Sequence, residues 1–171
     1  MMKKFFTIAI ILVAAFSTAK VHAQGFKIGL GAEGALPLGN LKNLYNFGAG
    51  ATIRASFGID ESSAVTLTSG AIAFIPKDLN SGIDLKAQLN IPIKGGFKYN
   101  LAGPMYAIAE AGVTIVKSYY PDASGNLQST TGSSFTYAPG IGVNLGGFDA
   151  SVRYEGYSGA GFAALRLGFS F

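Results

Sequence analysis

The last stretch of the chain, Phe162-Ala-Ala-Leu-Arg-Leu-Gly-Phe-Ser-Phe171, decides how the rest is interpreted. In a β-strand, successive side chains point to opposite faces. One face of this stretch is therefore wholly apolar and carries Ala163, Leu165, Leu167, Phe169 and Phe171. The opposite face carries Ala164, Arg166, Gly168 and Ser170. Such a strand suits a membrane barrel, in which one face meets lipid and the other faces a polar interior.

The N-terminus predicts an exported protein. Lys3 and Lys4 precede an almost entirely apolar run over residues 5–16, and residues 17–23 form a polar segment that ends in Val21-His22-Ala23. These are the parts of a secretory signal peptide, and the apolar run is too short to span a bilayer. No Cys follows this run, so a lipoprotein anchor is not expected. We predict a cleaved signal peptide over residues 1–23 and a barrel domain over residues 25–171.

The composition excludes several functional classes. The complete chain has 13 Lys and Arg against 9 Asp and Glu, but Lys3, Lys4 and Lys20 leave with the signal peptide. The remaining charges nearly balance, so no nucleic-acid partner is predicted. The chain has no Cys, which excludes a disulfide framework. Its one His, His22, lies in the signal peptide.

Alternation with period two dominates the rest of the chain and predicts eight strands, at residues 26–36, 45–57, 64–74, 85–99, 105–117, 135–145, 148–157 and 162–171. Segments of this length suit tilted strands that cross a bilayer, and an even number returns both termini to one side. Connections after the second, fourth and sixth strands are short, and those after the first, third and fifth are longer. The predicted fold class is all-β, an eight-stranded antiparallel up-and-down transmembrane β-barrel.

Two of the predicted strands contain irregularities. Ile72 and Phe74 are apolar at positions that share a face with Thr66 and Thr68, so we predict a bulge near Ser69-Gly70. Pro139 lies within the sixth strand, where its missing N–H requires a bulge or a local break.

Aromatic residues gather near the predicted strand ends, as the girdles of a membrane barrel do. On the side of the short turns they are Phe26, Phe57, Tyr99, Phe148, Phe169 and Phe171. On the side of the longer loops they are Tyr45, Phe47, Tyr119, Phe135, Tyr137, Tyr154 and Phe162.

With this pattern, and with its terminal Phe169-Ser-Phe171, the whole mature chain resembles the small eight-stranded outer-membrane barrels of the OmpA/OmpX kind. It is similar in particular to the short single-domain barrels common in Bacteroidota. The resemblance implies a location in the outer membrane of a Gram-negative cell envelope, surrounded by outer-membrane lipid. It also implies that Phe169 and Phe171 form an assembly signal, read by the barrel-assembly machinery through the C-terminal strand.

Charged side chains recur on the predicted inner face. The basic ones are Lys27, Arg54, Lys86, Lys94, Lys98, Arg153 and Arg166, and the acidic ones are Glu33, Glu110, Asp149 and Glu155. They could line a basic pore that favours anions. They could instead form an ion-pair network that fills the lumen, which we favour because eight strands leave room for little beyond side chains.

Catalytic, cofactor and metal sites are not predicted. The segment Gly29-Leu-Gly31-Ala-Glu-Gly34 matches the dinucleotide-binding fingerprint, but neither the helix nor the βαβ unit that the fingerprint requires follows it. Hydrolytic barrel enzymes mostly use a His base, and the mature chain has neither His nor Cys. The acidic residues are scattered, without a close pair. We therefore expect no enzyme.

Three functions remain open at this point. The first is a structural or interaction protein whose outer loops, above all residues 120–134, bind an unknown extracellular ligand, as an adhesive surface or a receptor would. The same loop has the composition of a mobile, solvated connection. The second is a narrow porin-like channel for small solutes. The third is a soluble exported ligand binder of the lipocalin kind, which requires apolar residues inside and Lys94 and Arg166 in solvent.

The gel mobility of the protein tests the membrane barrel directly. An unboiled sample should migrate differently from a boiled one on a denaturing gel, because a closed barrel has no strand edge at which dodecyl sulfate could start to unfold it. Identical mobilities of the two samples would contradict a closed membrane barrel.

Overall fold

The structure is a computed structural model and describes residues 25–77, 87–121 and 127–171. The predicted signal peptide and Lys86 lie outside these ranges. Within them, no helix has the length and apolar character needed to cross a membrane.

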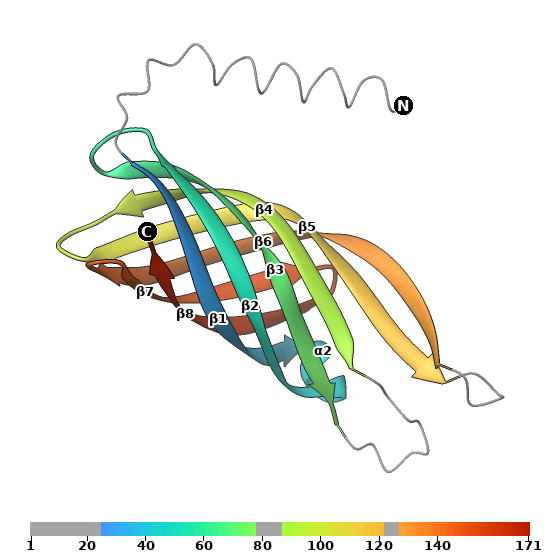
Figure 1. Ribbon diagram of the computed structural model, residues 1–171. Helices are drawn as coiled ribbons and strands as arrows, with labels where there is room; N and C mark the ends of the chain where they lie inside the picture. The colour runs from blue at the N-terminus through green and yellow to red at the C-terminus, as the bar shows by residue number, and fades with distance from the viewer. Residues whose placement is uncertain (1–24, 78–86, 122–126) are drawn as a thin grey trace, which may run out of the picture.

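Eight antiparallel strands form one closed barrel in chain order (Figure 1). They are β1 (Phe26–Gly39), β2 (Tyr45–Gly58), β3 (Ser63–Pro76), β4 (Gln88–Asn100), β5 (Met105–Pro121), β6 (Leu127–Leu145), β7 (Phe148–Tyr157) and β8 (Ala160–Ser170). The one short helix, α2 (Leu41–Leu44), lies between β1 and β2. The fold class predicted from the sequence is confirmed.

The strand pairing fixes the stagger of the barrel. From Gly29 of β1, successive paired residues are Arg54, Thr68, Lys94, Gly112, Thr136, Tyr157 and Ala160, and the path returns to β1 at Gly39. One circuit therefore advances the register by ten residues, from 29 to 39. A stagger of this size requires strongly tilted strands, which Figure 1 shows.

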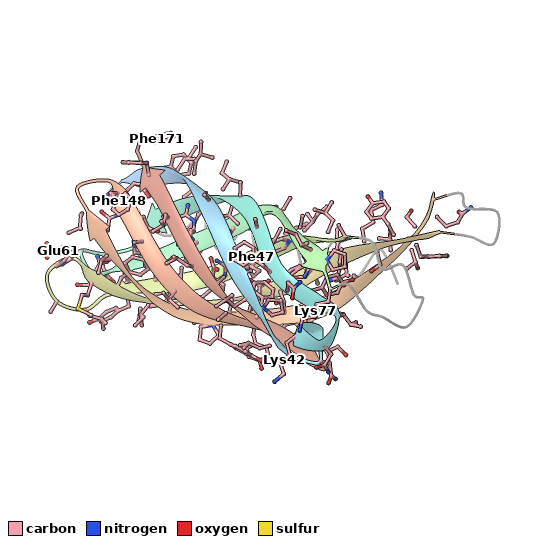
Figure 2. All side chains as sticks on the ribbon, turned by 90° about the horizontal axis from the view of Figure 1, so that it is seen from below. Lys42, Phe47, Glu61, Lys77, Phe148 and Phe171 are labelled. Carbon is pink, nitrogen blue, oxygen red and sulfur yellow. The ribbon has the colours of Figure 1, made fainter. Side chains whose placement is uncertain are left out.

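The two ends of the barrel differ. Both termini and the turns at residues 59–62, 101–104 and 146–147 lie at one end, which we call the terminal end. At the opposite end, the loop end, α2 joins β1 to β2 and the pair Ser158-Gly159 joins β7 to β8. Figure 2 shows Glu61, Phe148 and Phe171 toward the terminal end, and Lys42 and Lys77 toward the loop end.

Two predicted connections are largely regular structure. Residues 120–134 were predicted to be an outer loop, but β5 continues to Pro121 and β6 begins at Leu127, so most of this segment is paired β-strand. Residues 130–134 pair with the part of β5 that still pairs with β4, and only the tip is a two-stranded ribbon. The Ser and Thr residues of the segment show no apolar alternation, and this hid the strands from the sequence pattern. Between the first two strands, β1 reaches Gly39 and α2 follows, where the sequence predicted an irregular loop.

The bulge predicted in β3 is wrong. β3 keeps a single register with β2 from Ile75 to Ala64, and Ile72 and Phe74 point into the barrel, fully buried. They form an apolar part of the lumen near the loop end, beside the buried amides of Gln88 and Asn90. At Pro139, the β6–β7 pairing is interrupted between Tyr137 and Gly140 without a register shift, so the expected local break occurs and no bulge is needed.

The outer surface is a continuous apolar belt. Every strand presents large hydrophobic side chains outward, among them Leu30, Ile53, Leu67, Ile93, Val113, Ile141, Val152 and Leu165. Leu165 and Leu167 are 47% and 45% exposed while Arg166 is 1% exposed. This inverted distribution suits lipid outside and polar groups inside. The soluble lipocalin-like alternative requires the opposite arrangement and is excluded.

The aromatic girdles are present with two exceptions. Phe26 packs on Phe57 and Phe148 on Phe169, with ring centroids 5.0 and 5.5 Å apart, on the outside of the terminal end. Tyr137 and Tyr154 lie together on the outside of the loop end. Tyr45 and Phe162 were expected in the outer girdle, but both are buried inside the barrel. Phe162 shares the inward face of Arg166, and the register shift between Tyr45 and Phe47 turns Tyr45 inward, so the prediction for both was wrong.

Close contact between neighbouring strands makes one glycine a sharp test of the fold. A Cβ at Gly112 would lie 2.1 Å from the carbonyl oxygen of Ile93, whereas a Cβ at Gly95 would meet nothing within 4 Å. We expect Gly112→Ala to lower the free energy of unfolding by about 1–3 kcal/mol, since the backbone must shift.

The matched control is Gly95→Ala, on the neighbouring strand, with an expected effect within about 0.5 kcal/mol. The measurement is urea unfolding in lipid vesicles, followed by tyrosine fluorescence. Equal stabilities of the two variants would contradict the strand packing at Gly112.

Candidate functional site: the lumen and the loop end

Eight charged side chains form a closed cycle of ion pairs in the middle of the lumen, which we call the charge ring. Its signs alternate in the order Lys94, Glu155, Arg153, Glu33, Arg166, Asp149, Arg54 and Glu110, and Glu110 returns to Lys94. Neighbouring charges are 2.6 to 3.9 Å apart, measured from nitrogen to oxygen. All eight side chains are at most 5% exposed.

Each charge in the ring thus contacts two charges of the opposite sign, and four cations balance four anions. Burial of an unpaired charge is very costly, so an alternating cycle is a physically sound way to fill a narrow polar lumen. The members come from β1, β2, β4, β5, β7 and β8, so the ring links opposite walls of the barrel.

Neutral groups complete the ring. Thr52 donates a hydrogen bond to Glu33 at 2.7 Å and accepts one from Arg166 at 3.0 Å. Thr68 accepts from Arg54 at 3.1 Å and donates to Glu110. The Tyr106 hydroxyl donates to Asp149 at 2.8 Å. These bonds fix the rotamers of the charged side chains.

Inward-facing glycines make room for the large members of this network. A Cβ at Gly31 would lie 2.8 Å from the guanidinium carbon of Arg166, and one at Gly142 would lie 2.5 Å from the Tyr106 ring. Gly31 belongs to the segment that matches the dinucleotide fingerprint. That segment lies in the middle of β1, paired with β2 and β8, and not at a strand-to-helix turn. Its glycines serve packing.

An apolar cluster closes the lumen between the charge ring and the loop end. It consists of Ala35, Leu41, Tyr45, Ile72, Phe74, Tyr157, Phe162 and Ala164. Phe74 packs on Phe162 with ring centroids 5.2 Å apart, and both side chains are fully buried. Leu41 of α2 joins the cluster, so the short helix helps to close this end of the lumen.

The terminal end has a water-accessible cavity of about 600 Å³. Lys27, Lys98, Asp60 and Glu61 line it together with uncharged polar residues. The Lys98 ammonium lies 3.8 Å from the centroid of the Tyr106 ring, a cation–π contact. Tyr106 is itself bonded to Asp149, so Lys98 connects the cavity lining to the charge ring.

The structure brings most of the predicted interior charges together, but not all of them. Glu33, Arg54, Lys94, Glu110, Arg153, Glu155 and Arg166 are in the ring, together with Asp149. Lys27 is not: it is exposed at the terminal end and, among the described residues, forms no ion pair. Lys98 also stays outside the ring. Thr52, Thr68 and Tyr106 were missed as partners, although their inward parity was visible in the sequence.

The predicted assembly residues lie on the outer surface of the terminal end. Phe169 and Phe171 are 63% and 73% exposed. The Phe171 N–H donates to the Ile28 carbonyl and the Ile28 N–H donates to the Phe171 carbonyl, both at 2.9 Å. These bonds complete the seam between β8 and β1. In the described parts of the chain, no three His, Cys, Asp or Glu side chains gather as metal ligands would.

The loop end carries one long projection. β5 and β6 pair as far as Pro121 and Leu127, beyond the last β4–β5 pair at Gln88 and Ser118. Figure 1 shows this ribbon extending past the loop end of the barrel. It is the largest described element at this end.

Comparisons with solved structures find small eight-stranded outer-membrane barrels. Ail, the attachment invasion locus protein of Yersinia pestis, was solved in complex with the heparin analogue sucrose octasulfate. It matches with a TM-score of 0.63 and 14% identity over 85% of this chain and 97% of Ail. The N-terminal β-barrel domain of Pseudomonas aeruginosa OprF matches with a TM-score of 0.59 and 14% identity, over 85% and 97%. Neisserial surface protein A matches with a TM-score of 0.52 and 12% identity, over 86% and 95%.

No family model and no curated protein matches the chain. At these identities the structural neighbours show the fold, and they confirm the resemblance to small outer-membrane barrels. They are proteins of Gram-negative outer membranes, in agreement with the predicted location. The more specific likeness to the Bacteroidota barrels stays a prediction.

The charge ring can be tested by breaking one of its corners. Glu155→Ala leaves Lys94 and Arg153 each with one carboxylate fewer in a buried site, so we expect a loss of about 3–5 kcal/mol in the free energy of unfolding. Glu61→Ala, at the exposed terminal end, should change it by no more than about 0.5 kcal/mol.

The double variant Lys94→Met/Glu155→Leu removes one charge of each sign and keeps the ring neutral. It should therefore be more stable than Glu155→Ala in the same urea titration. If the double variant loses as much free energy of unfolding as Lys94→Met and Glu155→Leu lose together, charge pairing does not govern the stability of the ring.

Proposed function

We propose that the protein is an outer-membrane barrel that acts as a structural and interaction component, with the terminal end in the periplasm and the loop end outside the cell. The single observation that carries the proposal is the filled lumen. A barrel whose interior is occupied by its own side chains offers its exposed loop end for function. The fold of its neighbours supports the same reading.

Two successive barriers favour this function over the porin-like channel. The charge ring occupies the middle of the lumen, and every member is within 4 Å of two others. Phe74 and Phe162 fill the space beyond it. An ion that enters from the terminal-end cavity would have to break paired charges and then pass the closely packed rings of Phe74 and Phe162.

The outer surface of the barrel indicates what surrounds the protein. The apolar belt supports contact with outer-membrane lipid, because its outward side chains are large and apolar and Lys117 points outward only near the loop end. The exposed Phe169 and Phe171 on the last strand support a role as the signal for the barrel-assembly machinery. The proposal includes no enzymatic activity, since the mature chain holds neither His nor Cys, and each buried carboxylate of the described residues is paired with cations.

Binding of a polyanion, such as the heparin analogue in the Ail complex, is not part of the proposal. In the sequence, residues 40–44, 77–87 and 117–126 carry Lys42, Lys77, Lys86 and Lys117 against Asp78, Asp84 and Asp122. This near balance of charge gives little electrostatic attraction for a sulfated sugar.

Conductance in planar lipid bilayers separates the anchor from the channel. The wild-type protein should show no steady open level, and Phe162→Ala should show none either, because the charge ring still blocks the lumen. A stable open level that responds to replacement of Arg54 or Arg153 would overturn the proposal in favour of the channel.

A further inference from the structure

The β5–β6 ribbon has an unpaired edge. β6 pairs with β5 from Leu127 onward, but β7 pairs with β6 only from Thr136 onward. Within the described part of the chain, residues 129–135 therefore have a neighbouring strand on one side only. We call this segment the β6 edge. It runs from Phe135, which pairs with Val113 in the barrel wall, to Ser129, which lies on the projection beyond the last β4–β5 pair (Figure 1).

The register shows which backbone groups point away from β5. The Asn144 N–H donates to the Pro104 carbonyl at 2.8 Å, and the β5–β6 register is unbroken from there to the end of the ribbon. In an antiparallel pair, alternate residues direct both their N–H and their C=O to the same neighbour. Even-numbered residues of β6 therefore face β5. The odd-numbered ones face the free side: Ser129, Thr131, Ser133 and Phe135.

Pro139 agrees with this assignment. It is odd-numbered, so its nitrogen faces β7, and the β6–β7 pairing is interrupted at that position. The β5–β6 pairing continues through Ala109 and Pro139 without a break. The pairing with β5 and the pairing with β7 therefore indicate the same alternation of backbone N–H and C=O groups along β6.

The β6 edge lacks the devices that normally prevent a strand from pairing with another chain. Natural edges carry charged residues, prolines or bulges, or are very short. Between Asp122 and Asp149 the sequence has no charged residue, and residues 129–135 contain no Pro. The register of this segment has no shift. A Cβ at Gly132 would meet nothing within 4 Å, so the ribbon is open around its middle.

We propose that the β6 edge binds an extended, uncharged segment of another protein by β-strand addition. Main-chain hydrogen bonds to the odd-numbered residues would supply the affinity, as in other strand-addition complexes. Phe135, 66% exposed, offers an apolar contact at one end of the edge, and Thr131 favours β-branched or hydroxyl side chains beside it. This inference rests on the proposed function, which places the loop end outside the cell.

A second copy of the chain in the same membrane does not fit this edge. Two barrels in one membrane are related by an axis along the membrane normal, so their β6 strands run in the same sense along that normal. Antiparallel pairing needs strands that run in opposite senses. Parallel pairing about such an axis needs strands without tilt, whereas a barrel with this stagger has strongly tilted ones. A separate extended segment has no such constraint.

The experiment uses the full barrel in lipid nanodiscs and a fluorescent peptide, Thr-Val-Thr-Val-Thr-Val-Thr, as the probe. Binding is measured by fluorescence anisotropy. Thr131→Pro removes an N–H that faces the free side and no bond to β5, so the barrel should fold with its normal gel shift and bind the peptide at least about tenfold more weakly. The control Thr131→Ala keeps that N–H and should bind within about threefold of the wild type.

The matched control peptide has Pro at every second position, cannot complete the ladder, and should not bind. Equal binding of both peptides, or equal affinities of Thr131→Pro and the wild type, would overturn the strand-addition proposal. The proposed function is tested separately with Ser133→Cys, which introduces a single thiol into a chain without Cys. A membrane-impermeant maleimide should label it on intact cells. Failure to label refutes the outward orientation, whereas labelling without peptide binding refutes only the edge site.

Discussion

Closure of the backbone hydrogen-bond ladder is the constraint on which the rest of this structure depends. In hydrocarbon no water is present to satisfy an unpaired N–H or C=O, so a sheet in a membrane must close on itself. Here the seam is made by β1 and β8, paired from Gly29 with Ser170 to Gly39 with Ala160. With eight strands and a stagger of ten residues, closure leaves a lumen only wide enough for side chains.

The narrow lumen explains the chemistry inside it. Polar residues must face inward because apolar ones face lipid, and charged groups buried together must be paired. The chain meets both demands with a neutral, alternating ring from Lys94 round to Glu110. Near the loop end, aromatic residues such as Phe74 and Phe162 fill the space beside the hydrogen-bonded amides of Gln88 and Asn90. The same packing that stabilises the barrel closes it to solutes.

The segments that project beyond the membrane are under a different constraint. Water can satisfy their backbone groups, so strands there need not have two neighbours. β6 continues toward the loop end after its pairing with β7 has ended, which leaves residues 129–135 with one partner strand, β5. β5 and β6 also extend three pairs beyond the last β4–β5 pair. The closed barrel and the β6 edge are thus two parts of one chain under different constraints, the first from lipid and the second from water.

The sequence by itself determined the strands and their two faces, because the alternation of Leu165, Arg166 and Leu167 is a local property that each strand shows alone. It therefore predicted the fold class, the apolar exterior and the residues that face inward. Only the tertiary structure decided which of those residues meet. Glu33 and Arg153 are paired through the stagger of distant strands, and the register shift between Tyr45 and Phe47 turns Tyr45 inward where a girdle was expected. The unpaired edge also depends on the relative lengths of β6 and β7, which no single strand encodes.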